Sequence, residues 1–216
     1  MKSNRILHMD SDIPSIYFPV GTIEDGGTCA FATEKCMEYC PSGFEPNEHE
    51  KYALEFFKTN DAKAISRKII ADYQELINET HYYAEIIQWH VWGDCLPELT
   101  DKTFRTMLDI NRAEIPQYGF TRNRELWNLI PTSDIFRIGF TTDDPQEAIE
   151  LSRATGKMLC SPDIEHGYAQ MFHHGKLRSR CSGWWCITEE ETRNSDCRKC
   201  LKLGQGCFYR RNGEQA

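Results

Sequence analysis

The chain has 216 residues, of which 40% are hydrophobic and 12% aromatic, enough to bury a substantial core. Its formal net charge of −8 argues against a general polyanion-binding protein. No apolar run is long enough for a membrane span, and the N-terminus lacks the apolar region of a secretory signal. We therefore expect a cytoplasmic protein, in which ten cysteines favour metal binding over disulfides.

The charge is unevenly distributed along the chain. From Lys176 onward, nine lysines and arginines stand against five aspartates and glutamates, so this tail is basic and the remainder acidic. A basic tail either contacts nucleic acid or offsets the negative charge of thiolate–iron centres. We favour the second interpretation and do not expect nucleic acid as a partner, because the basic residues are too sparse for a nucleic-acid-binding stripe.

A cysteine-rich loop follows the first predicted strand, which covers residues 16–20. The loop carries Cys29, Cys36 and Cys40 and is preceded by Gly26-Gly27. A loop of this kind can wrap an iron–sulfur cluster, giving thiolates to three of its four irons and leaving the fourth iron open. Free cysteines or disulfides are the alternatives, but a second cysteine group at the other end of the chain favours the metal site.

Predicted helices and strands alternate through the rest of the chain. Helices are expected after Asn47, after Asp61, from a Thr100 cap, over 125–130 and between Asp144 and Gly156; strands are expected over 86–92, 117–120, 135–140, 157–160 and 169–173. This alternation predicts parallel pairing and an α/β fold. Because a complete eight-fold barrel takes about 250 residues, we expect an open, partial parallel β/α barrel over residues 1–175.

Small and polar residues follow several of these strands. Ligands of parallel sheets and barrels bind at the carboxyl ends of the strands. That edge would carry the cysteine loop, Gly93-Asp94, Thr121-Arg122, Thr141-Thr142-Asp143 and Ser161. Each of these groups has an alternative interpretation as turn chemistry or a helix cap.

A second cysteine group lies in the segment 176–216, which we expect to be a Cys-rich metal- or cluster-binding tail. Cys186, Cys197, Cys200 and Cys207 together predict an all-thiolate site, with Cys181 as a competing ligand. Their spacing suits either a second iron–sulfur cluster or a structural zinc ion.

The aromatic residue before the last cysteine of the loop, in Tyr39-Cys40, and the acidic Gly93-Asp94 after a strand resemble motifs of the radical S-adenosylmethionine (SAM) superfamily. The combination of the three loop cysteines, His90-Val91-Trp92-Gly93-Asp94, Phe120-Thr121-Arg122 and the C-terminal cysteines looks more closely like the phage "gene product 88" family, whose function is uncharacterised.

This resemblance implies a [4Fe–4S] cluster on Cys29, Cys36 and Cys40, with the amino and carboxylate groups of SAM on its open iron. It implies that Tyr39 lies near the adenine, that Gly93 and Asp94 meet the amino group, and that Arg122 belongs to the cofactor site. For a phage protein the location would be the host cytoplasm. The spacing Cys-x6-Cys-x3-Cys and the shortened acidic motif depart from the superfamily pattern.

Three functions remain open from the sequence. The first is a radical-SAM-like enzyme with an unknown substrate. The second is a non-catalytic iron–sulfur protein that transfers electrons to a redox partner or senses redox state. The third is a zinc-stabilised binding module.

Overall fold

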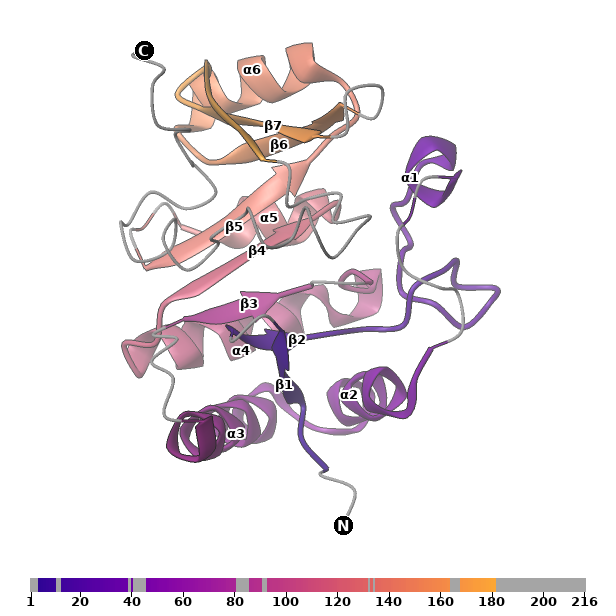
Figure 1. The fold of residues 1–216 in the computed structure, drawn as a ribbon, viewed down its shortest axis with the longest axis vertical. Coiled ribbons are helices and arrows are strands. Elements are labelled where there is room, and N and C mark those ends of the chain that lie inside the picture. Colours follow the sequence, from indigo (N-terminus) through magenta and orange to yellow (C-terminus); the bar gives the residue numbers. More distant parts are fainter. Residues whose placement is uncertain are drawn as a thin grey trace. The chain divides into compact units, whose positions relative to one another are not determined.

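The computed structural model describes residues 4–10, 13–38, 40, 46–80, 86–90, 93–131, 133, 135–163 and 168–181. The fold is α/β, and the chain divides into two compact units, Met1–Ile138 and Gly139–Ala216 (Figure 1). The strands are ordered in the sheet as in the chain, β1-β2-β3-β4 in the first unit and β5-β6-β7-β8 in the second. Within these ranges, no helix is both long and apolar enough to cross a bilayer.

The described residues of the first unit form the strands β1 (Leu7–Asp10), β2 (Ile13–Ile16), β3 (Ile87–Trp89) and β4 (Gln117–Thr121). β1 and β2 form an antiparallel hairpin, whereas β3 pairs in parallel with both β2 and β4. The hairpin was not predicted, and the strand expected over 16–20 instead ends at Ile16. Pro19 has no N–H for a ladder, and its carbonyl accepts from the Thr28 N–H at 2.9 Å.

The helices of the first unit are α1 (Glu34–Glu38), α2 (Glu48–Thr59), α3 (Ala62–Thr80), α4 (Thr100–Arg112) and α5 (Arg124–Leu129), with a 3-10 turn η1 (Pro97–Leu99) before α4. Asn47 caps α2 in a capping box with Glu50, and Asp61 Oδ1 accepts from the Ala64 N–H at the start of α3. Both predicted starts are confirmed. Thr100, by contrast, is not the N-cap of α4 but its first residue, because α4 continues directly from η1.

The core of the first unit lies between its helices and strands. α3 lies next to β1 and α4 (Figure 1), and its Ile65 and Ile69 are fully buried, as the four-residue apolar spacing predicts. Asp72, on the same helix, is also fully buried, and its Oδ2 accepts from the Ile6 N–H at 2.7 Å while Oδ1 pairs with Lys68. This carboxylate therefore attaches the first strand to a helix far along the chain.

β5 (Phe136–Thr141) begins in the first unit and ends in the second, which also holds α6 (Pro145–Thr155), β6 (Leu159–Asp163), β7 (Tyr168–His173) and β8 (Lys176–Cys181). Asp144 caps α6, Pro145 is its first residue, and Gly156 ends it with a φ of 67°, as predicted. α6 lies against β6 and β7 (Figure 1).

Parallel pairing does not extend through the second unit. β5 and β6 are parallel across α6, but β6–β7 and β7–β8 are antiparallel. The expectation of parallel pairing throughout is wrong here, because four residues join β6 to β7 and two join β7 to β8. A parallel crossover takes a dozen residues or more. β8 occupies the first residues of the segment 176–216, and residues 182–216 lie outside the described ranges.

Candidate functional site

The base of the cysteine loop is attached to the turn after β3. The Thr28 hydroxyl donates to the Pro19 carbonyl at 2.9 Å and accepts from the Asp94 N–H at 3.0 Å. The Cys29 N–H donates to the Gly21 carbonyl at 2.9 Å. The first cysteine of the loop is thereby held beside the acidic turn, as the expected carboxyl-edge site requires.

Gly93 allows this close approach. Its φ is +70°, and a Cβ on it would lie 2.5 Å from the Phe18 carbonyl oxygen and 2.6 Å from Thr28 Oγ1. A left-handed conformation is easily reached only by glycine, and here the missing side chain also leaves room for the loop. The glycine of the predicted motif therefore has a structural role in joining the two segments.

Asp94 is a buried carboxylate that ties the end of β3 to the end of β4. Its Oδ1 accepts from the Cys95 N–H at 2.7 Å and from the Thr121 hydroxyl at 2.6 Å, and its Oδ2 accepts from the Arg122 N–H at 2.7 Å. An ionised carboxylate offers about four lone-pair sites. These bonds within the described residues leave one site on Oδ2 for another donor.

The three loop cysteines form no disulfide and are of intermediate exposure. Cys36 lies in α1, a helix that the sequence did not predict and that buries none of its residues, and Thr33 Oγ1 accepts from the Cys36 N–H at 3.1 Å. Burial raises the pKa of the Cys29 thiol to about 12, opposed by a hydrogen bond from Gly21 and reinforced by the charges of Asp94, Cys36 and Cys40. The cysteines are thus near enough to interact electrostatically with Cys29.

Within the described ranges, no group of three or more His, Cys, Asp or Glu side chains is close enough to hold one metal ion. The predicted ligands Cys186, Cys197, Cys200 and Cys207 lie outside those ranges, and so does Tyr39. Arg122 directly follows β4.

Cys95, next to Asp94, is a structural thiol. It is 1% exposed, and its Sγ lies 3.3 Å from Thr103 Oγ1 and 3.4 Å from the Leu96 carbonyl oxygen. Burial raises the pKa of the Cys95 thiol to about 12. What sets Cys95 apart from the loop cysteines is its position: it is buried in the core with its thiol hydrogen-bonded, whereas the loop cysteines are partly exposed.

His90, at the end of β3, is the most unusual side chain near Asp94. Its backbone φ is +52°, its side chain is fully buried, and its Nδ1 lies 3.2 Å from the Phe120 carbonyl and 3.8 Å from Asp94 Oδ1. Burial lowers the pKa of His90, so the ring is neutral, donates from Nδ1 to Phe120 and keeps a lone pair on Nε2. Among the residues that the structure describes, the buried Nε2 has no hydrogen-bond partner.

This arrangement has a cost in folding free energy. A left-handed conformation costs a residue with a side chain about 1–2 kcal/mol, and an unsatisfied buried acceptor costs about 1–3 kcal/mol. The sequence suggested only a packed histidine at this position, since neither the backbone conformation nor the lack of a partner for Nε2 is visible in a strand-like run of residues.

We expect the metal-free protein to lose stability as the pH falls below about 6.5, the ordinary pKa of histidine. His90 binds a proton in the unfolded chain at such pH but not in the folded chain, because burial lowers its pKa. His90→Asn should show a shallower loss, since asparagine does not titrate, tolerates positive φ and can still donate to Phe120. Urea unfolding at pH 5 to 7.5 measures both slopes. The lowered pKa of His8 contributes to the slope of both proteins, so only His90 can make the two slopes differ. Equal slopes would therefore contradict this account.

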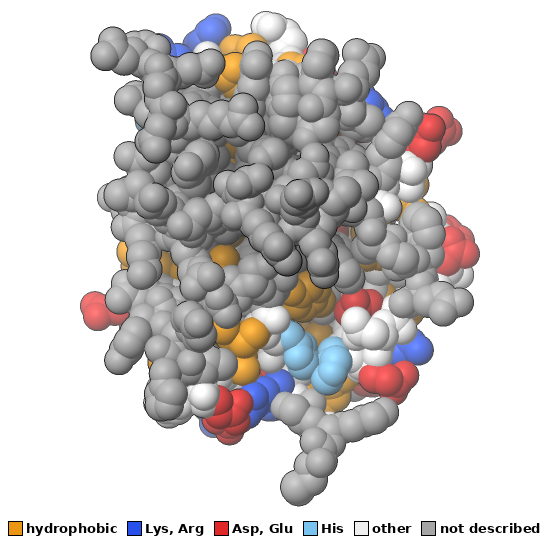
Figure 2. Space-filling model, viewed as in Figure 1, with side chains coloured by type: hydrophobic (Ala, Val, Ile, Leu, Met, Phe, Trp, Pro, Cys, Tyr) orange, Lys and Arg blue, Asp and Glu red, His pale blue; other side chains and the backbone are white. Residues whose placement is uncertain are grey.

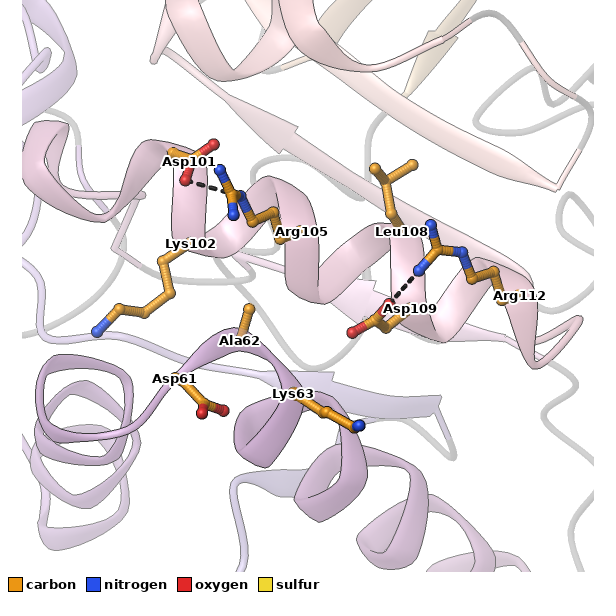
Figure 3. Close-up of a pocket in the computed structure, with 9 residues that line it drawn as sticks. All are labelled: Asp61, Ala62, Lys63, Asp101, Lys102, Arg105, Leu108, Asp109 and Arg112. Carbon is orange, nitrogen blue, oxygen red and sulfur yellow. Dashed lines mark hydrogen bonds and ion pairs between the residues drawn. The ribbon is translucent and has the colours of Figure 1, made fainter.

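A cavity of about 610 Å³ lies apart from the cysteine loop, between α3 and α4 (Figure 3). Its charged side chains are largely satisfied by the protein. Arg105 pairs with Asp101 at 2.9 Å, Arg112 pairs with Asp109 at 2.6 Å, and Lys102 Nζ donates to the Phe57 carbonyl at 2.8 Å. The groove is therefore a poor candidate for the functional site.

His8 and His49 form a histidine pair. Figure 2 shows histidine side chains side by side on the face viewed there, and the ring centroids of His8 and His49 are 3.9 Å apart. His8 Nε2 lies 3.3 Å from the Arg5 carbonyl. Among the described side chains the pair gains no third ligand of the kind that a metal ion needs.

Comparisons with protein-family models, with curated proteins and with solved structures found no match to this chain. The candidate site therefore rests on its own geometry. Hydrogen bonds of Asp94 bring the base of the cysteine loop, the turn after β3 and the end of β4 at Thr121-Arg122 together. Thr28 joins the two segments and was missed, although a hydroxyl directly before the first cysteine was the available signal.

Proposed function

We propose that this chain is an iron–sulfur protein that holds a [4Fe–4S] cluster on Cys29, Cys36 and Cys40. Its α/β architecture would correspond to a partial parallel β/α barrel resembling that of radical SAM proteins, with a Cys-rich extension after it. The observation that carries the proposal is the bond between Thr28 Oγ1 and the Asp94 N–H at 3.0 Å. It links the thiol loop to the acidic turn at the carboxyl ends of parallel strands, where such folds bind ligands.

The three loop cysteines have the chemistry that ligands of an iron–sulfur cluster need. None of the three thiols is in a disulfide, and their charges, with that of Asp94, interact unfavourably when all are ionised. A cationic iron–sulfur core would relieve that repulsion, since metal binding deprotonates thiols and stabilises thiolates. Three thiolates leave one iron open.

We propose that SAM occupies the open iron, with its amino group toward Gly93 and Asp94, Tyr39 beside the adenine and Arg122 as a further contact. A reduced cluster would supply one electron for the cleavage of SAM. Cys186, Cys197, Cys200 and Cys207 would hold a second cluster or, as the alternative, a structural zinc. The protein would act in the cytoplasm, that of the host if a phage encodes it, on a substrate whose identity the site does not specify.

A second candidate, an electron carrier or redox sensor without SAM, is favoured by one observation. Three donors of the protein already occupy the Asp94 carboxylate. The ammonium group of SAM would find one remaining lone-pair site there instead of a vacant carboxylate.

The test is metal analysis followed by spectroscopy of the anaerobically purified protein. We expect iron and acid-labile sulfide, and zinc without iron would refute both candidates. Electron paramagnetic resonance of the reduced protein with and without SAM then separates them. A spectrum that changes with SAM supports the enzyme, and identical spectra support the carrier. Asp94→Ala is a poor probe here, because it also removes the acceptor for three protein donors.

A further inference from the structure

We propose that the contact between His8 and His49 is a pH-sensitive latch, which holds the start of α2 against β1 at neutral pH and releases it in mild acid. His8 lies in β1, His49 is the second residue of α2, and their ring centroids are 3.9 Å apart. α2 is the first described helix after Cys40, so the latch fixes the segment into which the cysteine loop runs. The inference needs neither a metal ion nor SAM and is therefore independent of the proposed function.

The first step is the protonation of the His8 ring. Nε2 lies 3.3 Å from the Arg5 carbonyl oxygen, which can only accept a hydrogen bond, so the proton of the neutral ring resides on Nε2. Burial of this partly exposed side chain lowers the pKa of His8, and the neighbouring His49 lowers it further. A second proton on the ring is therefore opposed by lost hydration and, once His49 is protonated too, by the charge of that ring.

The second step is the charge around the pair. Besides the two rings, the charged groups described beside it are Arg5 before β1, Asp72 on α3, and Glu48, Glu50 and Lys51 in the first turn of α2. The residue opposite His8 on β2 is the uncharged Ser15. Asp72 raises the pKa of His8, and Arg5 lowers it.

The carboxylates among these groups already have partners in the protein. Asp72 accepts from the Ile6 N–H at 2.7 Å and pairs with Lys68. Glu48 pairs with Lys51 at 3.6 Å, and Glu50 accepts from the N–H of its cap at 3.2 Å. None of these carboxylates is reserved for an imidazolium ring, so protonation of both histidines leaves two cations in contact.

The third step is which segment moves when the rings repel. β1 is held independently of the latch, because it pairs with β2 along its whole length and is attached to α3 through Asp72. Residues 47–49 are exposed, so the first turn of α2 can leave β1 while the β1–β2 ladder stays intact. A cation at His49 is also unfavourable in itself, since it adds to the positive end of the helix dipole.

The pH range follows from the direction of the shift. Because the pKa of His8 in the folded chain lies below its ordinary value of about 6.5, the latch contributes fully above about pH 6.5. Its contribution is lost as the pH falls through the lowered pKa, where the open state binds the proton more tightly than the closed state.

The experiment is amide hydrogen exchange of the full chain from pH 7.5 to pH 5, corrected for the intrinsic pH dependence of exchange. The amides of residues 51–54 report on the start of α2, where the Lys51 N–H donates to the Asn47 carbonyl at 3.2 Å. The amides of α4 serve as the internal reference for opening of the whole unit. His49→Gln removes the second ring at an exposed position, and His174→Asn is the matched control, an exposed histidine of the other unit whose φ of +52° asparagine tolerates.

We expect protection at the start of α2, relative to α4, to fall about tenfold in the wild type as the pH drops, the effect of a pKa lowered by one unit. His49→Gln should show a shallower fall, and nuclear magnetic resonance should place the pKa of its His8 closer to 6.5 than in the wild type. His174→Asn should behave as the wild type does. Wild-type protection that follows α4 at every pH overturns the latch, and so does a fall that is equally steep in His49→Gln and His174→Asn. Should His49→Gln fail to fold, the wild-type comparison of α2 with α4 still decides.

Discussion

We expect Cys36→Ser to lose nearly all of the iron that the wild-type protein binds, with an iron affinity more than about tenfold lower. Cys36 supplies one of the three proposed thiolates, and it lies in α1, none of whose residues is buried. Loss of iron therefore cannot be traced to a disrupted core. Iron and sulfide analysis after anaerobic reconstitution gives the readout, and circular dichroism checks the fold.

Cys95→Ser is the matched control for this change. It makes the same atomic substitution at a thiol that is 1% exposed and hydrogen-bonded to Thr103. We expect this variant to keep its iron and to lose only some stability. Iron retained by Cys36→Ser, or lost equally by both variants, would show that the loop cysteines are not the specific ligands.

Gly93→Ala should destabilise the protein by about 2–5 kcal/mol and lower its iron content. About 1–2 kcal/mol of this comes from placing a side chain at φ +70°, and about 1–3 kcal/mol comes from the collision of Cβ with Phe18 and Thr28, 2.5 and 2.6 Å away. The collision also pushes Thr28 away from the Asp94 N–H, so the base of the cysteine loop moves.

Gly26→Ala isolates the two contributions, because Gly26 has a φ of +78° and its Cβ would meet nothing within 4 Å. We expect it to cost only the conformational part, about 1–2 kcal/mol, and to leave iron binding intact. Denaturant unfolding of both variants measures the difference. Similar losses of stability in the two would mean that the close approach at Gly93 contributes nothing.

Local sequence signals predicted the parts of the fold that depend on local chemistry. The capping box of Asn47 and Glu50 and the Asp144-Pro145 start of α6 act within one helical turn, so they can be read directly from neighbouring residues. β6 and β7 were predicted as strands, but the β1–β2 hairpin, β8 and the antiparallel pairing of β6, β7 and β8 were not. Strand pairing depends on partners and connection lengths, and a strand-like run of residues does not name its partner.

In the candidate site, too, some features could be predicted from the sequence and others could not. Cysteine spacing and the Gly93-Asp94 dipeptide indicated where the chemistry would lie, and the link from Thr28 to Asp94 brings those segments together. The sequence did not predict the position of α1 around Cys36 or the nitrogen of His90 that has no partner among the described residues. The first depends on a short helix capped by Thr33, and the second depends on a backbone angle and on burial.

The distance along the chain between Thr28 and Asp94 has a consequence for the order of events during synthesis. The bond between them spans 66 residues, as does the bond between Ile6 and Asp72. A ribosome adds about 5–20 residues per second, so Asp94 follows Thr28 by roughly 3–13 s. Throughout that interval the loop thiols are present in a nascent chain that lacks their anchor. Iron–sulfur assembly on this loop would therefore belong to a late stage of translation or to the completed chain.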